Sequence, residues 1–422
     1  MIPIAIIGGG PAGLMAAEQL TRAGIAVELF DSMPSLGRKL LLAGIGGLNI
    51  THSESAPQFL RRYGQSQVRL QPVLAEFDAD ALRAWVHELG IETFVGSSGR
   101  VFPLEMKAAP LLRRWLSRLR AQGLVVHTRH RCVGVRGITA EAPAEAGYEL
   151  DFVSPDGQRS IRACAVIFAM GGGSWARLGS DAAWQHWLPA LAIQPLKPAN
   201  CGFHSTHSAM VQALAGSPLK NITLQLPWLD VSLKPARGEA VVTQWGIEGS
   251  VIYAHSAMIR DRIETNGNAE VVLDLLPDHS VEHLLQQLQS SNPKHSLSRQ
   301  WQGIGLSGIK AALLRDALPK AHWSDAQRVI NTAKALTLKL TAARPIDEAI
   351  STAGGVCWTE LAMTLASERF PGLFFAGEMI DWEAPTGGYL LTSCFATGRK
   401  AGLSAHAFLT HDLRKSRTRE YN

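Results

Sequence analysis

The chain has 422 residues, more than one hydrophobic core usually organises, so we expect on the order of two or three domains. Its 46% hydrophobic and 18% charged residues exclude an intrinsically disordered or fibrous protein. The net charge of +5 is spread along the chain, and only the tail over residues 414–419 is densely basic, which is typical of a solvated terminus. We therefore expect no nucleic-acid partner.

The cysteine content and the absence of long apolar runs narrow the class of protein further. The five cysteines are Cys132, Cys164, Cys201, Cys357 and Cys394. They form no CxxC pair, which argues against a disulfide framework or a zinc site, so we expect no metal and a cytoplasmic protein. The apolar start over 1–7 lacks the basic region of a signal peptide, and no run of about eighteen apolar residues predicts a membrane span.

The first predicted elements form a parallel βαβ unit. Residues 4–7 are a short apolar run, 8–11 are a glycine-rich turn, and apolar residues recur at helical spacing over 14–23 until Gly24. A second apolar strand is predicted over 25–30. Strand, glycine turn, helix and strand within about thirty residues indicate a Rossmann-like unit.

The motif Gly8-Gly9-Gly10-Pro11-Ala12-Gly13 satisfies GxGxxG at the junction of that strand and helix. Gly8 permits the tight turn, Gly10 lets a pyrophosphate approach the backbone, and Gly13 lets the helix pack on the strand. Pro11 and Ala12 begin the helix, whose free N–H groups and positive dipole end favour a phosphate. The motif therefore predicts a dinucleotide site.

Asp31 closes the second strand, where an acid accepts hydrogen bonds from the adenosine ribose. Glu28 is the competing acid, but it lies inside the strand rather than at its end. A carboxylate at this place repels a 2′-phosphate, so the site should prefer FAD or NAD to NADP.

The remaining elements suggest that the chain leaves this domain and returns to it. The predicted elements are helices over 80–89 and 109–122; strands over 124–135, 148–153 and 163–170; short β-runs from 195 to 274, including 221–226 and 239–245; helices within 281–335, including 281–289 and 309–318; a strand over 372–378; and a helix over 390–407. The predicted domains are 1–194 with 341–422, a β-rich insertion of 195–279 with 336–340, and a helical domain of 280–335.

A second GxGxxG occurs at Gly303-Ile304-Gly305-Leu306-Ser307-Gly308. No apolar strand precedes it and no strand with a terminal acid follows it, so we interpret it as a turn between helices. The sequence thus shows no second nucleotide domain for tightly bound NAD(P)H.

Three segments decide between the cofactors: Leu36-Gly37-Arg38-Lys39-Leu40-Leu41-Leu42-Ala43-Gly44, Gly372-Leu373-Phe374-Phe375-Ala376-Gly377-Glu378 and Pro385-Thr386-Gly387-Gly388-Tyr389. They resemble the BaiN-like family of NAD(P)/FAD-dependent oxidoreductases, and further blocks at 169–173, 238–250 and 352–356 extend the likeness along essentially the whole chain. The resemblance implies FAD and an α/β fold, in which a glutathione-reductase-like Rossmann domain carries an inserted β-barrel-like domain and a helical domain.

One segment departs from the family. Members usually carry glycine-arginine-cysteine-asparagine where this chain has Gly46-Gly47-Leu48-Asn49. Chemistry assigned to that arginine and cysteine cannot be transferred, and the substrate can differ accordingly.

The predicted cofactor-binding residues lie in the motif, the resemblance segments and two strands. Arg38 and Lys39 are expected to reach pyrophosphate or adenosine oxygens, and Glu378 to bind ribityl hydroxyls. By resemblance, the Val133 backbone contacts the adenine edge. The helix start after Gly387 and Gly388 is expected to stabilise negative charge on a reduced flavin. The full predicted set is Gly8, Gly10, Pro11, Ala12, Gly13, Asp31, Arg38, Lys39, Gly44, Val133, Gly171, Gly377, Glu378, Gly387, Gly388, Tyr389 and Leu390.

Three residues are candidates for substrate chemistry. Asn49 and His52 follow the glycine loop expected to face the flavin, and the Tyr389 hydroxyl is a candidate proton donor. For His52 and Tyr389 the alternative roles are those of a hydrogen-bonded loop histidine and a packing residue.

The sequence thus predicts an FAD-dependent oxidoreductase that moves hydride between a small organic substrate, or transient NAD(P)H, and an acceptor. The resemblance suggests small amines or unsaturated ketones as substrates. Two alternatives stay open: a flavin-dependent RNA-modifying protein, and a non-enzymatic FAD-stabilised binding or sensor protein. The sequence does not indicate the acceptor or the oligomeric state.

Overall fold

The computed structural model describes residues 1–138, 147–188, 191–229 and 235–419, with the side chains of 411–419 left out, so the basic tail predicted over 414–419 lies outside the described side chains. The chain forms two compact units, Met1–Lys197 with Ile350–Asn422, and Pro198–Ala349. Each unit has its own hydrophobic core.

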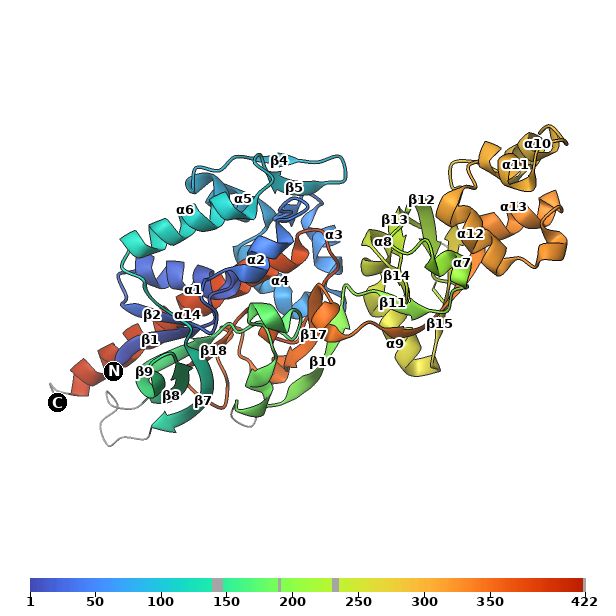
Figure 1. Cartoon of the computed structure of the whole chain (residues 1–422). Helices are drawn as coiled ribbons and strands as arrows, with labels where there is room; N and C mark the ends of the chain where they lie inside the picture. The colour runs from blue at the N-terminus through green and yellow to red at the C-terminus, as the bar shows by residue number, and fades with distance from the viewer. Residues whose placement is uncertain (139–146, 189–190, 230–234, 420–422) are drawn as a thin grey trace. The chain divides into compact units, whose positions relative to one another are not determined.

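A twisted parallel sheet organises the first unit (Figure 1). Its parallel strands, in spatial order, are β6 (Val125–Thr128), β2 (Val27–Asp31), β1 (Ile2–Ile7), β9 (Gly157–Phe168) and β18 (Leu373–Phe375). Side chains on β1 from Ile4 to Ile7 are buried, as the central strand of a two-sided sheet requires. The βαβ unit predicted for the N-terminus is confirmed.

The first half of β9 also pairs with the antiparallel strand β8 (Gly147–Ser154), which in turn pairs with the antiparallel strand β7 (Arg131–Ile138). The prediction of one continuous strand over 124–135 is wrong, because β6 and β7 are separated at Arg129, which has φ of 57°. The N–H groups of Arg129 and His130 bond the Met33 and Asp31 carbonyls and hold this turn against the end of β2.

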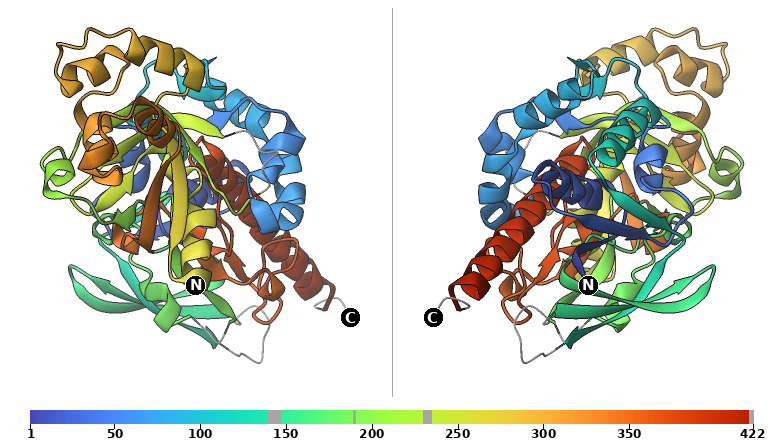
Figure 2. Two further views of the ribbon diagram at one scale, coloured as in Figure 1. Left: turned by 90° about the vertical axis from the view of Figure 1, so that its right-hand side faces the viewer. Right: turned by 90° about the vertical axis from the view of Figure 1, so that its left-hand side faces the viewer.

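Helix α1 (Pro11–Arg22) packs along α14 (Tyr389–Arg419), as Figure 2 shows. A Cβ on Gly398 would come within 2.2 Å of the Ala12 carbonyl oxygen, and one on Gly402 within 2.7 Å of the Ala16 oxygen. These two glycines, four residues apart, let the helix backbones touch.

The other elements of the first unit surround this sheet. They are helices α2 (Arg38–Ala43), α3 (Ala56–Arg61), α4 (Gln67–Glu76), α5 (Ala79–Glu88) and α6 (Ala108–Ala121), a small sheet of β3 (Thr51–His52), β5 (Arg100–Pro103) and β4 (Thr93–Val95), and the pair β10 (Ile193–Ala199) and β17 (Ser351–Val356). Helices α5 and α6 match the prediction within a residue or two.

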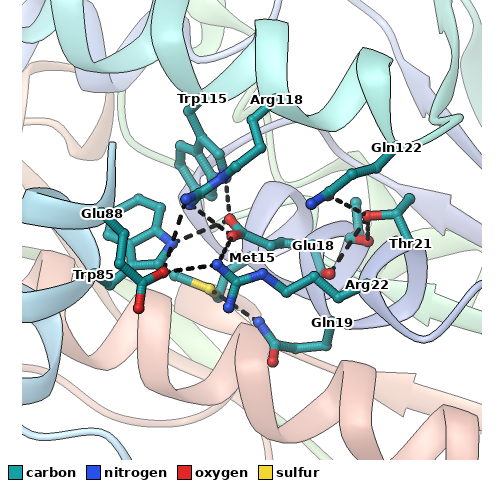
Figure 3. A network of polar contacts seen from close by, with 11 residues as sticks. Met15, Glu18, Gln19, Thr21, Arg22, Trp85, Glu88, Trp115, Arg118 and Gln122 are labelled. Carbon is teal, nitrogen blue, oxygen red and sulfur yellow. Dashed lines mark hydrogen bonds and ion pairs between the residues drawn. The ribbon is translucent and has the colours of Figure 1, made fainter. Parts of the chain in front are cut away.

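A buried carboxylate joins α1 to α5 and α6 (Figure 3). Glu18 accepts hydrogen bonds from the indole N–H groups of Trp85, at 3.1 Å, and Trp115, at 2.6 Å. The Arg118 guanidinium forms an ion pair with it at 2.6 Å. Because Glu18 has no exposed surface, these partners replace the water it loses.

The second unit is a closed barrel with helices packed on it. The strands run in the order β11 (Phe203–Ser205), β14 (Gly246–Glu248), β13 (Ala236–Val242), β12 (Pro218–Gln225), β15 (Ala269–Asp274) and β16 (Leu336–Ala343). The helices are α7 (Ala209–Gln212), α8 (Ser250–Tyr253), α9 (Ser256–Asn266), α10 (Val281–Gln289), α11 (Leu297–Gly303), α12 (Gly308–Ala317) and α13 (Ala326–Lys334).

Two expectations for this region have different outcomes. The second GxGxxG is the turn between α11 and α12, as predicted. The predicted helical domain of 280–335 is not separate from the β-rich insertion, because apolar residues of α10–α13 and of the barrel share one core. Strand β16 also continues past 340, and the chain re-enters the first unit at Ile350 rather than at 341.

Candidate functional site

The first unit contains an elongated pocket at the carboxyl ends of β1, β2 and β9, with about 1370 Å³ of empty space including its mouth. Its lining includes the glycine turn over 8–12, the end of β2 and the turn after β18, which are places that an extended dinucleotide contacts. The predicted residues that line it are Gly8, Gly10, Pro11, Ala12, Asp31, Arg38, Lys39, Gly171, Gly377, Glu378 and Leu390.

The three motif glycines have three different surroundings. Gly8 has φ of 107°, and a Cβ there would lie 2.3 Å from the Ala169 carbonyl oxygen. A Cβ on Gly13 would lie 1.9 Å from the Gly8 oxygen, so this glycine lets helix and turn pack. A Cβ on Gly10 would meet nothing within 4 Å. The open space beside Gly10 fits a diphosphate that lies against the backbone.

The start of α1 has the features of an anion-binding helix N-terminus. Gly10 is the N-cap and offers no side-chain cap, Pro11 follows it, and the first turn carries no acid. The N–H groups of the first turn have no acceptor within the helix, and the helix dipole adds positive potential there. The residues present therefore fit the diphosphate of FAD.

Asp31 lines the pocket at the end of β2. Its carboxylate accepts the N–H groups of Gly9, at 2.7 Å, and Met33, at 2.8 Å. Burial raises the pKa of Asp31, while these two hydrogen bonds oppose the rise. The competing Glu28 bonds His127 Nε2 at 2.7 Å and does not line the pocket. The geometry favours Asp31 as the ribose acid.

Lys39 and Glu378 meet on the pocket wall. Lys39 Nζ lies 2.9 Å from Glu378 Oε2 and also donates to Ser174 Oγ at 2.9 Å. The ion pair leaves further donor and acceptor capacity on both groups for hydroxyl or phosphate oxygens.

Three further glycines predicted to bind the cofactor, Gly44, Gly387 and Gly388, do not line the pocket. Gly44 packs on Ala108, and Gly388, with φ of 94°, has the Thr51 backbone against the position of a Cβ. Gly387 lies beside the Tyr389 ring.

Val133 is the extra residue in a register shift between Cys132 and Gly134, and its neighbours Arg131 and Cys132 line the pocket. A bulged residue leaves its backbone groups out of the ladder. Val133 itself does not line the pocket, and its contact with the adenine edge stays a prediction.

The three candidates for substrate chemistry do not line the pocket. They are Tyr389, His52 and Asn49, and they lie near the turn formed by Gly387 and Gly388. Tyr389 is buried, donates its hydroxyl to Glu54 Oε1 at 2.7 Å and stacks on the His52 ring. Both His52 ring nitrogens are engaged, by the Ser98 carbonyl and the Glu54 N–H. The Asn49 amide donates to the Thr51 and Val101 carbonyls. Their catalytic roles stay predictions.

Glu54 and Arg62 complete this cluster, and the sequence analysis missed both. Arg62 donates to both Glu54 oxygens, at 2.9 and 2.8 Å. Burial alone raises the pKa of Glu54, but hydrogen bonds from Arg62 and Tyr389 hold it below its usual value. Burial also raises the pKa of the Tyr389 hydroxyl. No spacing in the sequence links these residues to Tyr389.

Cys394 belongs to the hydrophobic core of the first unit and also lines the pocket. Burial raises the pKa of its thiol, which keeps it neutral.

The loop that departs from the family is closely packed. Gly47 has φ of 111°, and a Cβ there would lie 2.5 Å from Met106 Cε. Leu48 is buried and donates its N–H to the Met106 carbonyl. In this chain, Met106 therefore takes the space beside the positions where the family carries arginine and cysteine.

A membrane-spanning helix and a metal site are both absent from the parts of the chain that the structure describes. Those residues include no helix long and apolar enough to cross a membrane. They also include no group of three or more His, Cys, Asp or Glu side chains placed to hold a metal ion.

Comparison with known proteins matches this architecture. The family model described as HI0933-like protein Rossmann domain matches residues 2–404. A 3-dehydro-bile acid delta(4,6)-reductase of Clostridium scindens is 27% identical over 95% of this chain and 98% of its own length. A ribosomal RNA dihydrouridine synthase of Haemophilus influenzae is 25% identical over 94% of this chain and 97% of its own.

Two solved structures share the fold. A flavocytochrome c3 fumarate reductase in an open conformation has a TM-score of 0.53 and 14% identity, and the match covers 97% of this chain and 78% of that chain. The 3-ketosteroid delta1-dehydrogenase of Sterolibacterium denitrificans has a TM-score of 0.53 and 11% identity, over 96% and 99%. The matches confirm the predicted Rossmann-like fold and the BaiN-like resemblance.

Proposed function

Because the chain belongs to the HI0933-like Rossmann family and is an FAD-dependent oxidoreductase, we propose that it reduces a carbon–carbon double bond conjugated to a carbonyl group, with NAD(P)H as the reductant. The single structural observation that supports the cofactor in this proposal is the pocket in which the open space beside Gly10 meets the uncapped start of α1.

The relatives' names support the substrate class. A 3-dehydro-bile acid delta(4,6)-reductase adds hydrogen to double bonds conjugated to a ketone, and a dihydrouridine synthase adds hydrogen to a ring double bond conjugated to a carbonyl. When a double bond is directly conjugated to a carbonyl group, hydride adds to the carbon distant from the carbonyl and a proton adds to the carbon beside it. That shared chemistry is what we assign to this chain.

The protein's own contribution is to bind and orient. The start of α1 binds the diphosphate and Asp31 binds the adenosine ribose. Lys39 binds pyrophosphate or adenosine oxygens, and Glu378, its partner in the ion pair, binds ribityl hydroxyls. Bound FAD supplies two-electron transfer between NAD(P)H and the organic acceptor. Since no second nucleotide domain is evident, NAD(P)H is expected to bind transiently.

Tyr389 is the proposed proton donor. Its hydroxyl donates to Glu54, and Arg62, 47% exposed, links that carboxylate to solvent. Because the Arg62 cation lies beside the Tyr389 ring, it stabilises the tyrosinate left when the hydroxyl proton passes to the substrate, and water then returns a proton to that oxygen. The role requires the substrate to reach the hydroxyl beside Gly387 and Gly388.

The test begins with the purified protein. Its released cofactor should be FAD, NADH or NADPH should bleach the flavin anaerobically, and a steroid 4-en-3-one should restore the oxidised spectrum with stoichiometric saturation of the double bond. A saturated 3-ketosteroid is the matched control and should leave the flavin reduced. If both ketones leave the flavin reduced, the substrate proposal fails.

A second candidate, ribosomal RNA as the substrate, is favoured by the Haemophilus influenzae relative named as a ribosomal RNA dihydrouridine synthase. The same reduced protein, incubated with unmodified ribosomal RNA, distinguishes the two. Dihydrouridine formation that falls steeply with salt favours RNA, whereas enone reduction alone favours a small molecule. Failure of both acceptors to reoxidise the reduced flavin would refute both substrate classes.

A further inference from the structure

The segment over residues 178–187, here called the strap, lines the pocket after the triple glycine that follows β9. Neither the resemblance nor the motifs assigned it a role. Its residues on the pocket include Leu178, Asp181 and Trp184.

The strap is fixed on two sides. Trp184 Nε1 donates to the Gly171 carbonyl at 2.9 Å, and Ser180 Oγ donates to the Gly172 carbonyl at 3.0 Å. On its other side, a Cβ on Gly179 would lie 2.7 Å from Met33 Cγ, so the strap lies directly against the segment that follows Asp31. The strap therefore borders the ribose end of the pocket.

An ion pair links the strap to β7. Arg131 pairs with Asp181, and both residues line the pocket. The other Asp181 oxygen accepts the Ala183 N–H at 3.2 Å, which orients the carboxylate. Arg131 begins the strand that carries the Val133 bulge. The pair thus joins the two walls that flank the expected adenosine position.

We propose that Arg131 and Asp181 are positioning residues that close the adenosine end of the pocket and slow the release of FAD. Release requires the strap and the start of β7 to separate, and the ion pair must break for that to happen. The inference rests on FAD in this pocket and is independent of the substrate.

The pair is partly exposed, with Arg131 46% and Asp181 29% accessible. Exposed pairs of this kind contribute modestly and are screened by salt. Asp181→Asn and Arg131→Gln should each speed FAD release about two- to fivefold. Wild-type release should accelerate with added salt, and release from either variant should respond less.

The experiment follows flavin fluorescence after dilution of the FAD-loaded protein, at low and high salt. The matched control is Arg136→Gln, on the same strand, which breaks ion pairs to Glu149 and Asp151 outside the pocket lining and should leave release unchanged. The charge swap Arg131→Asp with Asp181→Arg should restore release to within about twofold of wild type, since it re-forms the pair.

Three outcomes overturn the proposal: release from Asp181→Asn at the wild-type rate, equal acceleration by Arg136→Gln, or acceleration by Arg131→Gln alone, which would mean that Arg131 contacts FAD directly. Asp181→Asn keeps the side-chain oxygen that accepts the Ala183 N–H. If the charge-swap variant does not fold, the test therefore depends on Asp181→Asn. Wild-type protein that binds no FAD would refute the cofactor assignment instead.

Discussion

Lys39 and Glu378, 339 residues apart in the sequence, form a 2.9 Å ion pair on the wall of the dinucleotide pocket. The pair joins the start of α2 to the turn after β18. Two segments that the resemblance singled out separately therefore meet at one place in the fold.

Breaking this pair should weaken FAD binding. Lys39→Met leaves Glu378 without its cation, and loss of a charge-assisted hydrogen bond costs about 1.5–3 kcal/mol, so the FAD dissociation constant should rise at least about tenfold. Titration of the apoprotein measures it. Asp274→Asn breaks a similarly shielded pair with Lys334 in the other unit and should leave FAD affinity unchanged.

Loss of the buried Glu18 carboxylate should destabilise the first unit. Glu18→Ala removes the buried partner of Arg118 and leaves the indole N–H groups of Trp85 and Trp115 without their acceptor, and removal of one partner of a buried pair costs about 3–5 kcal/mol. Urea unfolding of the apoprotein measures the change. Glu76→Gln, at exposed ion pairs with Arg399 and Lys400 outside this network, should cost less than about 1 kcal/mol. Equal losses from the two variants would show that the burial of Glu18 adds nothing to stability.

The Glu54 cluster predicts acid-sensitive stability. Because the pKa of Glu54 is lower in the folded chain, its stabilising contribution is complete above the unfolded value of about 4.3 and is lost as pH falls through the folded value. Glu54→Gln should lower the unfolding free energy by about 2 kcal/mol near pH 7 and by much less near pH 3. An equal loss at both pH values would contradict the assignment.

Tyr389→Phe tests the proposed proton donor. Flavin reduction by NAD(P)H should be unchanged, whereas reoxidation by an enone should slow about 100-fold, the usual size of a general-acid contribution. Stopped-flow measurement of the two half-reactions separates them. If both half-reactions keep wild-type rates and only stability falls, Tyr389 serves to hold Glu54 and pack the start of α14.

The βαβ unit could be predicted because its signals are local: an apolar strand, three glycines and a terminal acid lie within residues 2–31. Most pocket-lining residues follow from that unit and from the resemblance. Helices α2 and α3 were not predicted because each is only six residues long, and α4 was missed because Pro72 interrupts its pattern.

What the sequence could not predict depends on long-range contacts. The pairing of Arg131 with Asp181, and of Glu54 with Tyr389, arises only when distant segments meet. The close packing of α14 on α1 did have a signal, the glycines Gly398 and Gly402 four residues apart on one helix face.

The most direct test of the cofactor site is FAD titration of the Gly10→Ala apoprotein. The added methyl group meets no protein atom within 4 Å but fills the space assigned to the diphosphate, so FAD affinity should fall at least about tenfold while the unfolding free energy stays within about 0.5 kcal/mol of wild type. Gly13→Ala, whose methyl group would lie 1.9 Å from the Gly8 oxygen, should instead unfold more easily. Wild-type affinity for FAD in Gly10→Ala would contradict the account.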